Sequence, residues 1–219
     1  MNGEPRPTAG TIFLGLAAAL TAAYWVLTTL TFHLVRSDLD PCCTTLETYT
    51  TGTWDWWAQS AFVVFGLGWI AAAISLHRTL LAIRGAGLAG LSAGLLGVSL
   101  IGLGIFPTNA ADTPIAATLH DISGWALPAA AFSLALTGAW TMRAIPKWRP
   151  LAWTSLALGL LSSALIAALT IAPNTFVDTA GWWQRTALIV LLPTWLTLLG
   201  QRLARSRTPA PTPQAPAHL

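Results

Sequence analysis

The stretch GAGLAGLSAGLLGVSLIGLGIF, residues 85–106, contains no charged side chain. An α-helix needs about 20 consecutive apolar residues to cross the roughly 30 Å of hydrocarbon in a bilayer, so this stretch is long enough to span one. The bilayer interior offers no water to bond unpaired backbone groups, and a spanning segment of this length must therefore be helical. Residues 85–106 predict a membrane-spanning helix.

Five more apolar runs of similar length flank this stretch, and together they predict an all-α bundle of six transmembrane helices. The six expected spans are Thr11–Val35, Trp57–Leu76, Ala86–Phe106, Leu119–Met142, Leu151–Ala172 and Trp182–Leu203. The composition agrees, because 54% of the 219 residues are apolar and only 9% are charged, a balance typical of integral membrane proteins. The sequence therefore predicts a multi-pass membrane protein, with the lipid bilayer as a partner.

The charged residues separate onto two sides of these spans. One side carries Arg6, Arg78, Arg84, Arg143, Lys147, Arg149, Arg202, Arg205 and Arg207, whereas only Arg36 and Arg185 lie on the other. The positive-inside rule then places both termini in the cytoplasm and the protein in the cell membrane. The acids lie almost entirely on the predicted outer side, as Asp38, Asp40, Glu47, Asp55, Asp112, Asp121 and Asp178.

The segments outside the spans suggest how the chain is organised. We expect a short cytoplasmic segment at residues 1–10, the transmembrane domain at 11–204 and a disordered, Pro-rich cytoplasmic tail at 205–219. The first outer connection is long enough to fold over the bundle as a cap. The basic residues are scattered between apolar runs, which argues against a nucleic-acid partner. Gly90 and Gly94 form a small-xxx-small pair that could dock another helix, including one of a partner protein.

His120 is the strongest candidate for chemistry, because an imidazole exchanges protons near neutral pH. With Asp121 or Glu47 nearby it could form an acid–base pair or a proton relay. A purely structural alternative is that a helix starts here, with Thr118 as its N-cap and Asp121 completing a capping box. Both interpretations stay open from the sequence alone.

Further polar residues are expected beside His120 on the outer side. Tyr49, Asn109, Gln184 and Arg185 are candidate ligand-binding residues. Arg185 could bind an anionic head group, or it could pair with Asp178, Asp112 or Asp40 and tie helix ends together. The adjacent Cys42 and Cys43 are interpreted as structural or incidental, with an undetermined redox state. No nucleotide-binding, zinc-protease or other cofactor motif occurs, so we expect no metal site and no cofactor.

The chain also resembles a family of bacterial membrane proteins known as domain of unknown function 998. The resemblance rests on DPCCTTLETYTTGTWDWWAQSAFVVFGLG in the first outer loop, GIFPTN, TLHDISGW and GWWQR, in matching order. It implies six membrane helices and, as the family's name says, supplies no reaction. In the family an acid often follows Phe-Pro-Thr, where this chain has Asn109, and a Ser-acid-x-Tyr-like segment is here Glu47-Thr48-Tyr49.

These patterns favour a protein with an outward-facing polar pocket that binds or moves a lipid-like or amphiphilic small molecule. The alternative is a membrane-embedded enzyme that modifies an isoprenoid or lipid by acid–base chemistry at His120 and a nearby carboxylate. A third interpretation is a partner subunit that docks through its glycine-rich third span. The sequence does not identify the ligand.

Overall fold

The computed structural model of the protein describes residues 9–80, 83–107 and 113–205, and these residues form a bundle of long helices without strands. Six helical segments are long and apolar enough to cross a membrane, as the sequence predicted. The first five are α1 (Ala9–Val35), α2 (Asp55–Leu80), α3 (Ala86–Ile105), α4 (Pro114–Arg143) and α5 (Arg149–Ile171). The sixth comprises α6 (Ala180–Arg185), a π-helical turn (Thr186–Leu191) and α7 (Leu192–Arg205). Short 3-10 turns are η1 (Leu46–Thr50), η2 (Pro146–Trp148) and η3 (Pro173–Thr175).

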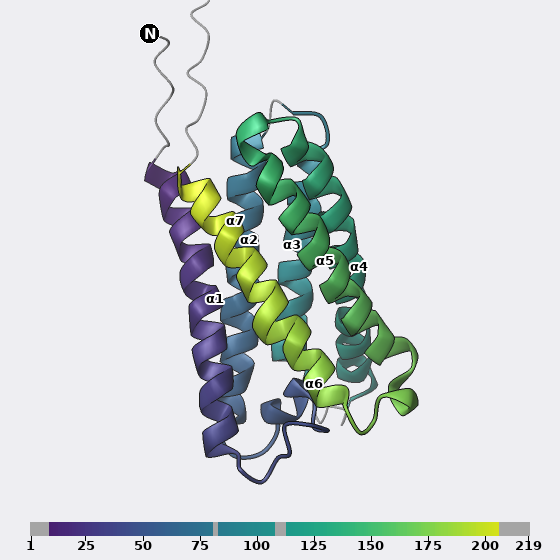
Figure 1. Cartoon of the computed structure of the whole chain (residues 1–219). Helices are drawn as coiled ribbons and strands as arrows, with labels where there is room; N and C mark the ends of the chain where they lie inside the picture. Colours follow the sequence, from purple (N-terminus) through teal and green to yellow (C-terminus); the bar gives the residue numbers. More distant parts are fainter. Residues whose placement is uncertain (1–8, 81–82, 108–112, 206–219) are drawn as a thin grey trace, which may run out of the picture.

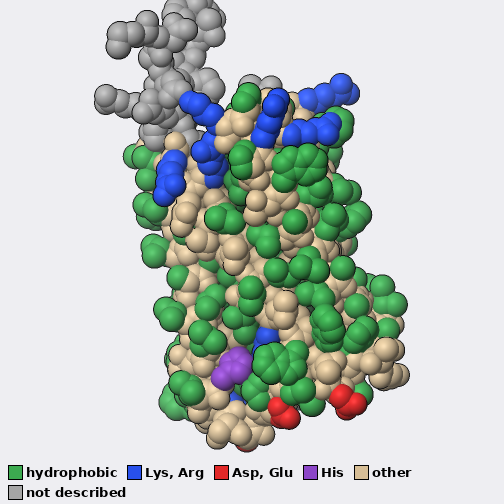
Figure 2. Space-filling model, in the orientation of Figure 1, with side chains coloured by type: hydrophobic (Ala, Val, Ile, Leu, Met, Phe, Trp, Pro, Cys, Tyr) green, Lys and Arg blue, Asp and Glu red, His purple; other side chains and the backbone are tan. Residues whose placement is uncertain are grey.

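The helices run side by side along the length of the molecule (Figure 1). α1 packs against α2 and α7, α3 packs between α2 and α4, and α5 packs against α4. The chain enters and leaves the bundle at the same end, which we call the terminal end, and the opposite end is the distal end (Figure 1). Lys and Arg side chains gather at the terminal end, and acidic side chains appear at the distal end (Figure 2). That the distal end faces outward stays a prediction from the positive-inside rule.

Small residues permit a close helix contact between α2 and α3. A Cβ added to Gly66 would lie 2.5 Å from the carbonyl oxygen of Gly97, and one added to Gly97 would lie 2.6 Å from that of Gly66. The two backbones therefore touch directly. Gly90 and Gly94, the predicted docking pair, face Ala73 of α2 within the same chain. A partner protein at this pair stays a prediction.

α4 begins earlier than the capping pattern at Thr118 predicts. Thr113, not Thr118, is the N-cap, and its hydroxyl oxygen accepts a hydrogen bond from the backbone N–H of Ala116. Pro114 occupies the first helical position, where its fixed φ suits the helix and its missing N–H costs nothing. The Thr118 hydroxyl donates to the carbonyl of Pro114 inside the helix. The proposed capping box between Thr118 and Asp121 is therefore wrong.

The sixth span widens into a π-helical turn immediately after α6. The N–H of Leu192 donates to the carbonyl of Ala187, five residues earlier. The carbonyl of Leu188 cannot be paired in the same way, because the residue five positions on is Pro193, which has no N–H. The indole N–H of Trp25 donates to this carbonyl instead. The missing N–H of Pro193 and the indole N–H of Trp25 together account for this π-helical turn. Such turns often lie at functional sites.

Candidate functional site

The loop between α1 and α2 folds over the distal end of the bundle, as the sequence predicted (Figure 1). Its 3-10 turn η1 buries Leu46 and Tyr49, each only 2% exposed. η1 packs against α2 and α6. Glu47, which lies between the two buried side chains, is thereby held against the ends of α4 and α6.

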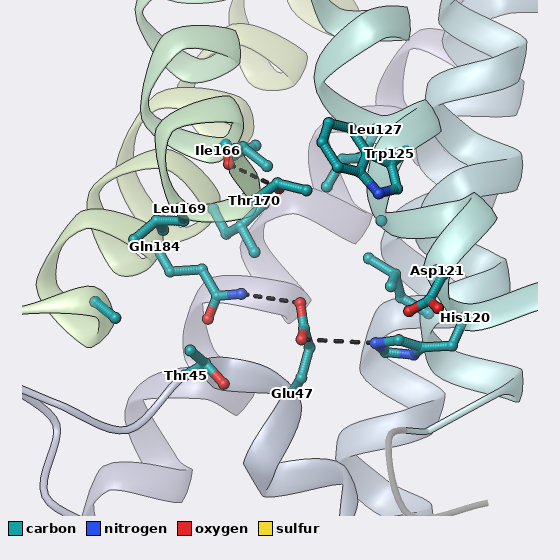
Figure 3. Close-up of a pocket in the computed structure, with 14 residues that line it drawn as sticks. Thr45, Glu47, His120, Asp121, Trp125, Leu127, Ile166, Leu169, Thr170 and Gln184 are labelled. Atoms are coloured by element: carbon teal, nitrogen blue, oxygen red, sulfur yellow. Dashed lines mark hydrogen bonds and ion pairs between the residues drawn. The ribbon is translucent and has the colours of Figure 1, made fainter. Parts of the chain in front are cut away.

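Two polar side chains from different parts of the chain, Gln184 and His120, meet at Glu47 (Figure 3). The Gln184 amide nitrogen donates to Glu47 Oε1 at 3.0 Å, and the Gln184 amide oxygen accepts the backbone N–H of Leu46. His120 Nε2 lies 3.7 Å from Glu47 Oε2. Gln184, which is 7% exposed, therefore fixes the carboxylate on one side while His120 faces it on the other.

The ring of His120 is oriented by the backbone of α3. Its Nδ1 lies 2.6 Å from the carbonyl oxygen of Phe106. A carbonyl oxygen can only accept, so Nδ1 must carry a hydrogen in either protonation state. Nε2, the nitrogen that faces Glu47, is therefore the one that gains or loses the exchangeable proton.

These residues line a cavity of about 250 Å³ at the distal end (Figure 3). One part of its wall is polar and comprises Thr45, Glu47, His120, Asp121, Thr170 and Gln184. The other part is apolar and includes Leu103, Trp125, Leu127, Ile166, Leu169 and Leu188. Apolar walls with a few placed polar groups are typical of small-molecule sites.

Arg185 lies beside this cavity but does not line it. Its guanidinium donates from Nε to His33 Nε2 at 2.7 Å, from Nη1 to the carbonyl of Thr44 at 2.6 Å and from Nη2 to the Tyr49 hydroxyl at 3.0 Å. His33 can accept because its Nδ1 donates to the carbonyl of Thr29, which makes His33 the neutral Nδ1–H tautomer. Arg185, only 5% exposed, fastens the distal loop to α1 and α6.

These contacts differ from the ion pair with Asp178, Asp112 or Asp40 that was one alternative for Arg185. Within the part of the chain that the structure describes, the ion pairs are Arg36 with Asp38 and, when His120 is protonated, His120 with Glu47. The acceptors around Arg185 are a neutral imidazole, a carbonyl and a hydroxyl, so neither Asp178 nor Asp40 pairs with it. Asp112, the third candidate, lies outside the described residues.

A family model described as "Protein of unknown function (DUF998)" matches residues 16–202. The chain belongs to this family. The match contains all the cavity residues named above, from Thr45 to Leu188. No curated protein and no solved structure matches the chain.

In this DUF998 protein the cavity brings together four of the seven residues singled out from the sequence, namely Glu47, His120, Asp121 and Gln184. Tyr49 and Arg185 form the adjoining loop anchor instead. Asn109 lies outside the described residues. Sequence reasoning missed Thr45 and Thr170, because a threonine in a polar loop or an apolar helix carries no signal of its own. It also missed the apolar wall, whose residues look like any others in the spans.

Cys42 and Cys43 are free thiols in the distal loop. Their Sγ atoms lie 3.1 and 3.2 Å from the carbonyl oxygen of Asp178. The neighbouring Cys42 side chain raises the pKa of Cys43 above its usual value, mainly through a hydrogen bond between the two. A smaller fraction of Cys43 is then the reactive thiolate at neutral pH.

Proposed function

We propose that this DUF998 protein binds, and moves or presents, a lipid-like or amphiphilic small molecule in the outward-facing distal cavity. The observation that supports this proposal is the two-sided wall of the cavity. Glu47, His120 and Gln184 form a hydrogen-bonding end, and leucine, isoleucine and tryptophan side chains form the rest. An amphiphile has the same division, since its head group needs polar partners and its chain needs apolar surface.

One observation favours a second function, acid–base modification of an isoprenoid or lipid. The His120 ring is held by the Phe106 carbonyl at Nδ1 and presents Nε2 toward Glu47 at the cavity. A general base needs this combination of an oriented ring and a free nitrogen. In this enzyme alternative, neutral His120 takes a proton from the bound molecule at Nε2, and Glu47 stabilises the imidazolium that results.

Filling the cavity with a side chain tests the binding proposal. A Cβ at Gly124, which lines the cavity, would meet no atom within 4 Å, so Gly124→Trp adds bulk without a backbone clash. Gly87 on α3 also has open space around its Cβ and lies outside the cavity, which makes Gly87→Trp the matched control. We expect native mass spectrometry to find co-purified lipid on the wild type and the control but not on Gly124→Trp. Equal lipid on both variants would refute the proposal.

A second measurement separates binding from catalysis. The wild type and His120→Asn are each incubated with a total membrane lipid extract, and the extract is analysed by mass spectrometry before and after. Binding alone leaves the lipid masses unchanged for both proteins. The enzyme alternative requires a new lipid species that appears with the wild type and is absent with His120→Asn.

A further inference from the structure

The acidic side chains give the wall of the cavity a negative charge. Glu47 and Asp121 are acids, and no Lys or Arg side chain among the described residues lines the wall. Even when His120 is protonated, these three groups together carry a net negative charge. One of the two amide N–H groups of Gln184 already donates to Glu47. A ligand that donates hydrogen bonds and carries positive charge is therefore matched best.

The backbone of α4 adds one more acceptor to the cavity. Pro128 lies inside α4 and has no N–H to give to the carbonyl of Gly124, four residues earlier. Gly124 is one of the residues that line the cavity, so the carbonyl that Pro128 leaves without this partner belongs to a lining residue. A carbonyl without its helical partner is suited to accept an N–H from a ligand.

The nearest buried cation does not change this balance. All three nitrogens of the Arg185 guanidinium already donate to His33, Thr44 and Tyr49. Arg185 is not among the residues that line the cavity. A phosphate or carboxylate head group would therefore face Glu47 and Asp121, with no Lys or Arg side chain of the described wall to pair with it.

An apolar groove of about 560 Å³ lies between α4 and α5, beside the cavity and toward the middle of the spans. Trp125 belongs to both, so the two spaces adjoin at this side chain. The groove is lined almost entirely by carbon, with Phe132 and Leu160 on opposite helices, and it lies where lipid tails surround the protein. A chain lying in this groove would place its head group in the cavity.

We infer that the ligand is a long-chain amphiphile with a basic amine head group, which reaches the cavity from the bilayer through the groove between α4 and α5. This inference rests on the proposed function and names the ligand class for that same site. The ammonium donates to the Glu47 carboxylate and the Gly124 carbonyl, with Asp121 at the rim. The alkyl chain passes Trp125 and occupies the groove.

A matched pair of photoactivatable amphiphiles tests both parts of the inference. The protein in phosphatidylcholine nanodiscs is labelled with hexadecylamine that carries a diazirine in its chain, and separately with the corresponding hexadecanoic acid. We expect the amine to label α4 and α5 peptides at residues 125–132 and 160–167 about tenfold more than the acid. That ratio is what one charge-assisted hydrogen bond supplies. Unlabelled hexadecylamine should compete.

Two variants make the test specific. Glu47→Gln keeps an oxygen that can accept from Gln184 but removes the charge, and it should abolish the preference for the amine. Asp178→Asn removes an exposed acid at the same end of the molecule, outside the cavity, and should leave the preference intact.

The outcomes distinguish the inference from the function on which it rests. Equal labelling by both probes, or an amine preference that survives in Glu47→Gln, overturns the basic head group while amphiphile binding stands. Competable amine labelling confined to other helices overturns access between α4 and α5. If neither probe labels and Gly124→Trp retains its co-purified lipid, the proposed function itself fails.

Discussion

Replacing Arg185 by lysine should release the distal loop while the bundle stays folded. The guanidinium donates to three acceptors on different segments, namely His33 of α1, Thr44 of the loop and Tyr49 of η1. A lysine ammonium keeps the charge, but its donors sit on a single nitrogen and cannot reach three separated acceptors together. We therefore expect Arg185→Lys to retain one of these hydrogen bonds and to lose two.

The size of the effect follows from the number of bonds lost. A hydrogen bond that involves a charged group contributes about 1.5–3 kcal/mol. Because the acceptors here are neutral, the lower value is appropriate, and two lost bonds give about 3 kcal/mol. Every 1.4 kcal/mol is a factor of ten in an equilibrium constant, so the equilibrium for opening the loop should rise about 100-fold.

Amide hydrogen exchange measures this opening directly. The N–H groups of Leu46, Thr48 and Thr51 are hydrogen-bonded in the closed loop, and each should exchange about 100-fold faster in Arg185→Lys. Amides in the middle of α2 and α3 should not change. Arg205→Lys, at the exposed terminal end, is the control and should behave as the wild type. Loop exchange within threefold of the wild type would refute the assignment of Arg185 as the anchor.

Two further predictions concern the bundle and the loop surface. Gly66→Ala places a Cβ 2.5 Å from the Gly97 carbonyl oxygen and should lower the unfolding free energy by about 1–3 kcal/mol in reversible detergent unfolding, whereas Gly87→Ala, with open space around it, should not. The Arg36 guanidinium lowers the pKa of the exposed Asp38 below its ordinary value, and NMR titration should find it restored in Arg36→Gln. Because the folded-state pKa is the lower one, the stabilisation by this pair is present at neutral pH and is lost as the pH falls through that value.

The local start of a helix was harder to predict than its existence. The apolar run correctly predicted the helix α4. However, α4 begins before the run, at Pro114, and Thr113 is its N-cap. Thr118 and Asp121 offer a second capping signal, a capping box, only about one turn further on. The sequence alone does not decide which of these two N-cap signals starts the helix. The choice depends on which residues the rest of the protein places at the bilayer surface.

The sequence by itself determined that this chain forms six membrane helices, because hydrocarbon thickness and the demand for paired backbone groups leave an apolar run of that length no other structure. It also identified His120, Glu47 and Gln184 as candidate site residues on the predicted outer side. Only the tertiary structure decided that these three meet in one cavity while Tyr49 and Arg185 form a separate anchor. Glu47 and Gln184 are 137 positions apart. Their contact depends on how η1 packs against α6, and neither segment encodes that packing alone.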